Sequence, residues 1–246
     1  MDVNIKIHRA DKDLPVLYIH GSGSNSKIWK NQLEAIGGYA IDLPGHGESD
    51  DANIETVEDY ARYVLEAMEE KGLDRMFIAG HSLGGAIAQM VYLIDRSRVM
   101  GLILVGTGAR LRVLDEILEG LKNDFDTMAK KLVNMLFSRK FSDSRIKDEV
   151  LKDLLSCGSR ITHRDFSACD KFDLLSDYKE GKVKVDVPVL CIVGSDDIMT
   201  PVKYSEFFRK TIGAEVKVIE DAGHMVMIEK PDEVNSTILE FVKSKS

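Results

Sequence analysis

Short runs of apolar, often β-branched residues alternate along this chain with longer segments that carry apolar side chains at helical spacing. The runs cover residues 5–7, 16–19, 39–43, 76–79, 101–105, 189–193 and 216–219. Such runs are typical of strands buried on both faces, as in a parallel sheet covered by helices. Residues 54–71 have an amphipathic stripe, and Thr56 followed by Asp59 predicts a helix start there. The alternation therefore predicts an α/β fold with a mostly parallel central sheet.

One long segment interrupts this alternation. Residues 110–186 contain no predicted strand, but three stretches, 111–121, 128–136 and 146–155, repeat apolar residues at helical spacing. The segment has 16 basic and 15 acidic residues, so it carries no strong field that would attract a charged polymer. We therefore expect a core made of residues 1–109 and 187–246, with residues 110–186 as a helical insertion.

Charge and cysteine content argue against several classes of protein. The formal net charge of −8 disfavours binding to nucleic acid or to an anionic membrane surface. No apolar stretch reaches the length of about 18 residues that a membrane span needs, and the first residues lack a signal-peptide core. Cys157, Cys169 and Cys191 form no CxxC pair, which disfavours a disulfide scaffold or a zinc site and leaves a Cys157–Cys169 bridge as the minor alternative. We expect a cytoplasmic protein with no membrane anchor and no metal.

A Gly-x-Ser-x-Gly motif spans residues 80–84, between the apolar run at 76–79 and a helical stretch at 85–93. Glycines suit a sharp strand-to-helix turn that exposes a serine, because bulky neighbours would collide there. The N-terminus of the following helix adds free N–H groups and a dipole that favours a nearby anion. Ser82 is therefore the candidate nucleophile, and a purely structural turn is the alternative.

A serine nucleophile needs a general base, and the base needs a group that orients it. Among the six histidines, His224 follows the last predicted strand and is the candidate base. His81 is adjacent to Ser82, and we expect its side chain to point the other way. His20 and His46 lie in glycine-containing turns, where we expect structural hydrogen bonds.

Two adjacent aspartates, Asp196 and Asp197, directly follow the run at 189–193. Loops at the carboxyl ends of parallel strands are where open α/β sheets build their sites. Residue types alone leave both aspartates open as the orienting acid, and Asp221 is a weaker third candidate.

A glycine-rich turn at residues 20–24 follows the run at 16–19. Such a turn can present a backbone N–H to a developing oxyanion, with the N–H groups of Ser22 and Leu83 as the two donors. A phosphate-binding turn is the alternative, but the GxGxxG spacing is absent because Ser26 stands where the third glycine is needed.

Five motifs together resemble the α/β-hydrolase superfamily, in the order Ser, Asp, His. They are HGSG at 20–23, DLPGHGES at 42–49, GHSLGG at 80–85, VPVLCIVGSDDIMTP at 187–201 and AGHMVMIEKP at 222–231. The resemblance implies a sheet of about seven or eight strands with helices on both faces, and it identifies residues 110–186 as the helical cap. Only one predicted strand precedes residue 16, where the family often has two, which favours seven.

The resemblance also assigns roles. It implies that Ser82 is the nucleophile and His224 the base. Asp197 rather than Asp196 matches the family's acid, because the spacing of a glycine three residues before it and a proline four residues after it fits. Ser22 and Leu83 match the oxyanion-hole positions, and the turn at 45–47 is structural.

The implied activity is a serine hydrolase that cleaves carboxylic esters with small to medium acyl chains and needs no cofactor. A small-molecule ester is the expected partner, and the oligomeric state is not predicted. The same triad serves C–C bond hydrolases, lactonases, haloperoxidases and acyltransferases, and a non-catalytic ligand receptor is a further alternative. Haloalkane dehalogenases and epoxide hydrolases carry aspartate at the nucleophile position, so Ser82 argues against both. Six apolar residues of the insertion either pack it against the core or line an acyl pocket: Leu118, Phe125, Met128, Leu132, Met135 and Phe137.

Overall fold

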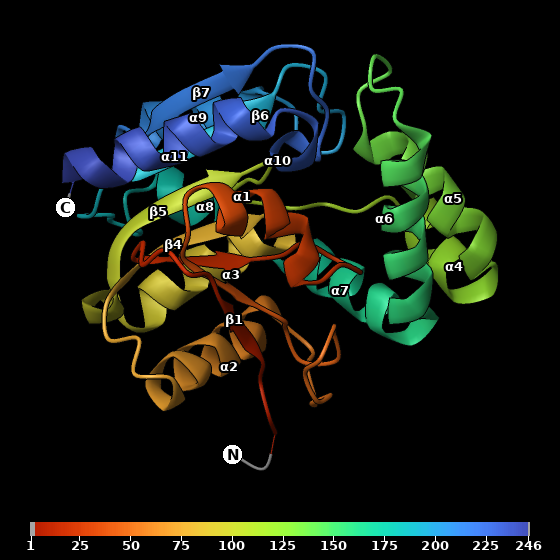
Figure 1. Cartoon of the computed structure of the whole chain (residues 1–246), viewed down its shortest axis with the longest axis horizontal. Helices are drawn as coiled ribbons and strands as arrows, with labels where there is room; N and C mark the ends of the chain where they lie inside the picture. The colour runs from red at the N-terminus through yellow and green to blue at the C-terminus, as the bar shows by residue number, and fades with distance from the viewer. Residues whose placement is uncertain (1–2, 246) are drawn as a thin grey trace.

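A seven-stranded sheet runs through the centre of the computed structural model, which describes residues 3–245 (Figure 1). The strands are β1 (Ile7–Arg9), β2 (Val16–Ile19), β3 (Tyr39–Ile41), β4 (Met76–His81), β5 (Val99–Val105), β6 (Val189–Gly194) and β7 (Glu215–Ile219). Their order is β1-β3-β2-β4-β5-β6-β7, and all pairings are parallel except that of β1 with β3. The predicted mostly parallel sheet is confirmed.

Helices cover both faces of the sheet because alternate strand residues point to opposite sides. In β2, for example, Leu17 and Ile19 belong to one buried cluster, and Val16 and Tyr18 to the other. The first face packs against α2 (Val57–Glu70), α3 (Leu83–Ile94) and α9 (Lys203–Ile212). The second packs against η1 (Ser26–Trp29), α1 (Lys30–Ala35), α10 (Val226–Glu229) and α11 (Pro231–Lys245). A short turn of helix, η2 (Arg96–Arg98), leads into β5.

Local sequence signals set several of these boundaries. The Thr56 side chain accepts a hydrogen bond from Asp59 N at 3.2 Å, and the Asp59 carboxylate accepts one from Thr56 N at 2.9 Å, which confirms the predicted start of α2. The first strand lies two residues later than predicted. Ile5 is buried in the core without pairing in the sheet, so its apolar character reports packing rather than strand structure.

The segment between β5 and β6 consists of helices. They are α4 (Asp115–Asn123), α5 (Phe125–Leu136), α6 (Ser144–Cys157), α7 (Ser159–Lys171) and α8 (Leu175–Lys179). Helices α4, α5 and α6 form a group at one side of the molecule, and α7 lies between this group and the sheet (Figure 1). The short α8 returns to the sheet, where Tyr178 joins the buried core and contacts Phe208 of α9. The division of the chain into two domains at residues 110 and 186 stays a prediction.

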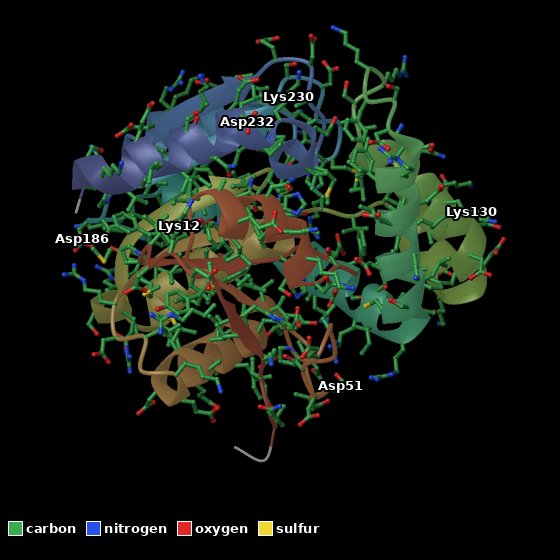
Figure 2. All side chains as sticks on the ribbon, viewed as in Figure 1. Lys12, Asp51, Lys130, Asp186, Lys230 and Asp232 are labelled. Carbon is green, nitrogen blue, oxygen red and sulfur yellow. The ribbon has the colours of Figure 1, made fainter. Side chains whose placement is uncertain are left out.

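Most charged side chains lie on the surface, and the cysteines are unpaired. Lys130 on α5 and Asp232 on α11 are exposed, and Lys130 lies at the outer edge of the molecule (Figure 2). Across residues 3–245, no helix combines the length and the apolar character that crossing a membrane would take. All three cysteines are free, so the Cys157–Cys169 bridge does not form in this structure.

Candidate active site

The carboxyl end of β4 leads into a sharp turn at Ser82. This serine has φ 53° and ψ −115°, a left-handed conformation that side chains other than glycine rarely adopt. The turn is tight on both sides: a Cβ at Gly80 would lie 2.0 Å from the Gly84 carbonyl oxygen, and a Cβ at Gly84 would lie 2.3 Å from the Ile19 carbonyl oxygen. The flanking glycines are therefore required by close backbone contact, and the turn leaves the side chain of Ser82 facing a cavity.

His224, in the loop after β7, lies beside Asp197, in the loop after β6. His224 Nδ1 is 2.9 Å from Asp197 Oδ2, and both side chains are buried. Asp197 also accepts hydrogen bonds from the backbone N–H groups of Met199 and Thr200, each at 2.8 Å. Burial alone would raise the pKa of Asp197, but the facing His224 ring and the Thr200 hydrogen bonds lower this pKa to about 2. An ionised carboxylate at this place fixes the tautomer of His224 with its Nδ1 proton toward Asp197.

The other two aspartates have different partners. Asp196 accepts a hydrogen bond from Ser138 Oγ at 2.6 Å, on the chain that follows α5. Asp221 forms an exposed ion pair with Lys140. The structure therefore brings Asp197, and neither Asp196 nor Asp221, against His224.

Thr200 is a contact of this pair that the sequence pattern does not predict. Its hydroxyl donates to Asp197 Oδ2 at 2.8 Å and lies 3.2 Å from His224 Nδ1. The signal that could have identified it is its position three residues after Asp197, where a hydroxyl and its own N–H can both reach back to a loop carboxylate.

Ser82 and His224 line one cavity, together with His81 and the glycine-rich turn at 21–24. Within residues 3–245, Ser82 Oγ makes no hydrogen bond to His224 or to any other group. In enzymes without bound substrate, catalytic hydrogen bonds are often long or poorly aligned and tighten when substrate binds. The structure thus places the Ser82 hydroxyl and the His224 imidazole on the wall of one cavity, without a hydrogen bond between them.

The neighbouring histidine does not lie where we expected. The His81 ring is 4.6 Å from the His224 ring between centroids, and its Nε2 donates to the His224 carbonyl oxygen at 3.0 Å. The expectation that it points the other way is wrong, because the left-handed turn at Ser82 interrupts the alternation of a regular strand. Burial lowers the pKa of His81 well below its usual value, so the ring is neutral and adds no charge beside His224.

His20 and His46 make the structural hydrogen bonds that their turns predict. His20 Nδ1 donates to the Gly21 carbonyl at 2.8 Å, and its Nε2 accepts from Leu43 N at 3.0 Å. His46 Nδ1 donates to the Pro44 carbonyl at 3.1 Å. Both side chains lie outside the cavity that Ser82 and His224 share.

Two backbone N–H groups near Ser82 have no acceptor in the described part of the chain. One belongs to Ser22 in the turn after β2, and the other to Leu83, the first residue of α3. The first N–H groups of a helix have no partner within the helix and favour negative charge. These are the two donors that the sequence singled out, and Ser22 itself lines the cavity with Ser82.

Two small cavities meet at Ser82. One, called the α6-side cavity below, has a volume of about 60 Å³ and extends past His224 toward α6. The other has a volume of about 50 Å³ and extends past Thr200 toward Arg112 and Tyr204. Both are lined by Ser22, Ser82, Phe166 and Met199. Such a site can hold one group on each side of a bond that Ser82 attacks.

The insertion lines the cavities with residues other than the six that the sequence singled out. None of those six lies on either wall, and Met128, Leu132 and Phe137 are buried in the packed core, which favours the packing interpretation. The insertion residues that do line the α6-side cavity are Leu136, Val150, Asp153, Leu154 and Phe166. Several of these residues belong to the apolar stripes that the sequence predicts for the insertion helices. The spacing of a stripe does not show which of its residues faces a cavity and which packs against the core.

A larger cavity, about 580 Å³, lies elsewhere, between the η1 region and the end of α6. It contains none of Ser82, Asp197 and His224, so it is not the candidate active site. Within residues 3–245, no group of three or more histidine, cysteine or acidic side chains is arranged to hold a metal ion.

The chain is similar in sequence and fold to proteins that are named as enzymes. The model of the alpha/beta hydrolase family matches residues 16–237. A solved structure described as that of a thermophilic esterase is 45% identical with a TM-score of 0.93, covering 99% of this chain and 95% of that one. The pimeloyl-(acyl-carrier protein) methyl ester esterase of Wigglesworthia glossinidia brevipalpis is 27% identical, over 93% of both proteins. A dihydrolipoyllysine-residue acetyltransferase component of an acetoin cleaving system from Pseudomonas putida is 28% identical over 93% of this chain, which spans 63% of that protein.

Proposed function

The chain belongs to the alpha/beta hydrolase family, and from this membership we propose that it is a serine hydrolase that cleaves carboxylic esters with small to medium acyl groups. The observation that carries the proposal is the buried Asp197–His224 pair, with 2.9 Å between Oδ2 and Nδ1, whose histidine lines the same cavity as Ser82. This is the arrangement that acyl transfer through a serine requires.

In the proposed reaction, Ser82 Oγ attacks the ester carbonyl carbon while His224 Nε2 takes the hydroxyl proton. The alcohol leaves with that proton, and an acyl-enzyme on Ser82 remains. His224 then removes a proton from water, whose oxygen attacks the acyl carbon, and returns this proton to Ser82 Oγ as the acid leaves. Asp197 stays ionised throughout, holds His224 through Nδ1 and stabilises the imidazolium that forms.

The oxyanion formed at each attack is held by the N–H groups of Ser22 and Leu83. Support comes from their lack of any other acceptor in residues 3–245 and from the dipole of α3 behind Leu83. A single donor of this kind contributes about 3 kcal/mol to transition-state stabilisation.

The size and lining of the two cavities support a small ester. Their volumes of about 60 and 50 Å³ are well below the roughly 300–1,000 Å³ of ordinary small-molecule sites. The α6-side cavity is mostly apolar, with Ile28, Val150 and Leu154 on its walls, and suits a short acyl chain. The similar solved structure described as an esterase agrees with this class of substrate.

The test begins with the nucleophile. A fluorophosphonate probe is expected to label Ser82, as read by peptide mass spectrometry, and Ser82→Ala is expected to lower turnover of a p-nitrophenyl acyl ester by several orders of magnitude. Unchanged turnover in Ser82→Ala would remove Ser82 from the mechanism.

The substrate class is tested on the wild-type protein. Rates are compared across p-nitrophenyl esters of rising chain length, lactones, a vinylogous diketone acid and an acyl-transfer assay with an alcohol acceptor. Ester hydrolysis that is fastest with short acyl chains is the expected result. Turnover of the diketone acid or lactone alone would assign the triad to C–C bond or lactone hydrolysis instead, and binding without turnover of any of these would indicate a ligand receptor.

A further inference from the structure

A fully buried carboxylate on α7 lies outside the proposed triad and still reaches the active-site turn. Asp165 is 0% exposed, and its Oδ2 accepts a hydrogen bond from Gly23 N at 2.8 Å. The same oxygen is 2.8 Å from His46 Nε2, and Oδ1 accepts a hydrogen bond from the Tyr60 hydroxyl. One side chain of the insertion thus ties together three parts of the core: the turn after β2, the turn after β3 and helix α2.

The charge of this carboxylate is balanced. Burial alone would lower the pKa of His46, but the Asp165 carboxylate raises this pKa to about 10, so the ring stays protonated. Burial alone would raise the pKa of Asp165, but the His46 imidazolium and the hydrogen bonds from Tyr60 and Gly23 keep it below its usual value. A neutralised carboxylate can lie near a developing oxyanion without repelling it, which an unpaired one could not do.

Asp165 is one of several residues on a single face of α7 that contact the turn after β2. The Cys169 Sγ is 3.6 Å from Ser22 Oγ, and a Cβ at Gly23 would come within 3.1 Å of Thr162 Cγ2. Thr162, Asp165 and Cys169 are three and four residues apart, so they project from the same side of the helix. Phe166, beside them, lines both cavities at Ser82.

The contacted glycine has little freedom to move. Gly23 has φ +64°, and a Cβ there would lie 2.4 Å from Leu154 Cδ1 of α6. Its N–H is committed to Asp165, and it directly follows Ser22, whose own N–H has no acceptor among the described residues. The direction of the Ser22 N–H therefore depends on where Gly23 is held.

We infer that Asp165 is a positioning residue for the oxyanion hole: by holding Gly23 N–H, it aims the Ser22 N–H at the place where the ester oxygen becomes negative. The inference rests on the proposed function of Ser82 and Ser22. It makes helix α7 part of the catalytic apparatus as well as a cover over it. Because the contact acts on a donor used most strongly in the transition state, its loss lowers kcat and leaves KM nearly unchanged.

Two substitutions at Asp165 separate positioning from charge. In Asp165→Asn, the amide oxygen can keep accepting from Gly23 while the amide nitrogen faces the Tyr60 hydroxyl, so kcat stays within about tenfold of wild type. In Asp165→Leu, no acceptor remains, and kcat falls by about 10²–10³-fold, the loss known for one oxyanion donor. Asp165→Ser, whose hydroxyl is too short to reach Gly23 but leaves room for water, takes the place of Asp165→Leu if the leucine variant does not fold.

The matched control is the neighbouring residue on α7. Arg164 docks the same helix through Asp51, labelled in Figure 2, and through the carbonyl oxygens of Pro44 and Ala52. It also donates to the Tyr60 hydroxyl at 3.2 Å, but it does not touch the turn at 22–23. Arg164→Gln is expected to lower the melting temperature and to keep kcat close to wild type. It therefore reports what weaker docking of α7 does while Asp165 still accepts from Gly23 N.

The measurements are kcat and KM on a p-nitrophenyl ester, the rate of Ser82 labelling by a fluorophosphonate, and the melting temperature of each variant. Positioning predicts that kcat and the labelling rate fall together in Asp165→Leu, that KM changes less than threefold, and that asparagine restores most of the loss. Equal kcat in Asp165→Leu and Arg164→Gln at similar melting temperatures would overturn the inference. Ser82→Ala is measured in parallel. If this variant keeps full turnover, the proposed function of Ser82 is wrong, and the inference about Asp165 falls with it. If the variant loses turnover, the Asp165 variants test the positioning role alone.

Discussion

At the scale of single residues, two adjacent aspartates in the loop after β6 have opposite surroundings. Asp197 points into the buried pair with His224, and Asp196 points to Ser138 Oγ near the surface. Both side chains are carboxylates of the same size, so their hydrogen-bond partners and their burial separate their roles.

Asp197→Asn and Asp196→Asn form a direct comparison. Asp197→Asn is expected to lower kcat by roughly 10³–10⁴-fold, because the amide no longer fixes the tautomer of His224 or stabilises its charged form. Asp196→Asn keeps an acceptor for Ser138 and is expected to stay within a few-fold of wild type. Steady-state kinetics of the two purified variants on one ester settle the matter, and a larger loss in Asp196→Asn would refute the assignment.

Residue type and order in the chain were enough to predict that Ser82 and His224 share a cavity. They left Asp196 and Asp197 both open, and only the spacing implied by the family resemblance selected Asp197, which lies against His224. They were not enough for Thr200, because a hydroxyl near a loop carboxylate is common and its partner is decided by the fold of the loop. His81 was misplaced for a related reason, since its direction follows from the backbone angles at Ser82 rather than from the strand pattern.

At the scale of elements, the α6 and α7 helices shape the space in front of Ser82. Val150 and Leu154 of α6 and Phe166 of α7 line the α6-side cavity. Leu132 of α5 is buried, like Leu154, but lines neither cavity at Ser82. Substituting a residue that lines the cavity and one that is buried away from it therefore separates the effect of pocket size from the effect of packing.

Leu154→Ala is expected to move the preferred acyl chain toward longer esters. Removing the side chain enlarges the α6-side cavity, and each added methylene that it accepts contributes about 0.8 kcal/mol of apolar burial. The measurement is kcat/KM across p-nitrophenyl esters of increasing chain length.

Leu132→Ala is the control for that change. It is expected to lower the free energy of unfolding by about 2–5 kcal/mol, as large-to-small core substitutions do, while its chain-length profile stays that of wild type. An identical shift of the profile in both variants would show that loosening of the insertion, and not the cavity wall, selects the substrate.

Helices with a clear apolar stripe or a capping pattern were predictable, and α7 was not. Its inward face carries Thr162 and Asp165 beside Cys169, and a hydrophobic pattern does not mark the threonine and the aspartate as buried. Polar residues at a helical interval identify an inward face only when their partners are known, and these partners come from turns more than 100 residues earlier in the chain. The order of the strands across the sheet was not predicted for the same reason, because it depends on pairing between segments far apart in the chain.

At the scale of the whole molecule, the His46–Asp165 pair links the insertion to the core and makes this link depend on pH. The pKa of His46 is raised from its usual 6.5 to about 10 in the folded protein. The stabilisation is fully present below pH 6.5, where both folded and unfolded states hold the proton. Above that pH the unfolded state loses its proton first, so the stabilisation declines until the pH passes 10.

The free energy of unfolding is therefore expected to fall between pH 7 and 9, by at most about 1.4 kcal/mol per pH unit from this group. His20 does not contribute in that window, because burial and the neighbouring His46 charge lower its pKa to about 4. Urea unfolding at pH 7, 8 and 9 measures the slope, with His46→Gln as the comparison. The variant should be less stable at pH 7 and show a shallower slope, and parallel slopes would mean that His46 is neutral in the folded protein.

The left-handed turn at Ser82 limits the thermal stability of this protein. A residue other than glycine held in such a conformation carries a strain of the order of 1–3 kcal/mol, and Ser82 bears it at φ 53°. Ser82→Gly should raise the midpoint of thermal unfolding while ending turnover, and calorimetry on the inactive variant would reveal the gain. A selection that rewarded heat resistance alone would discard the proposed nucleophile, so only a selection that also demands turnover preserves a serine at this turn.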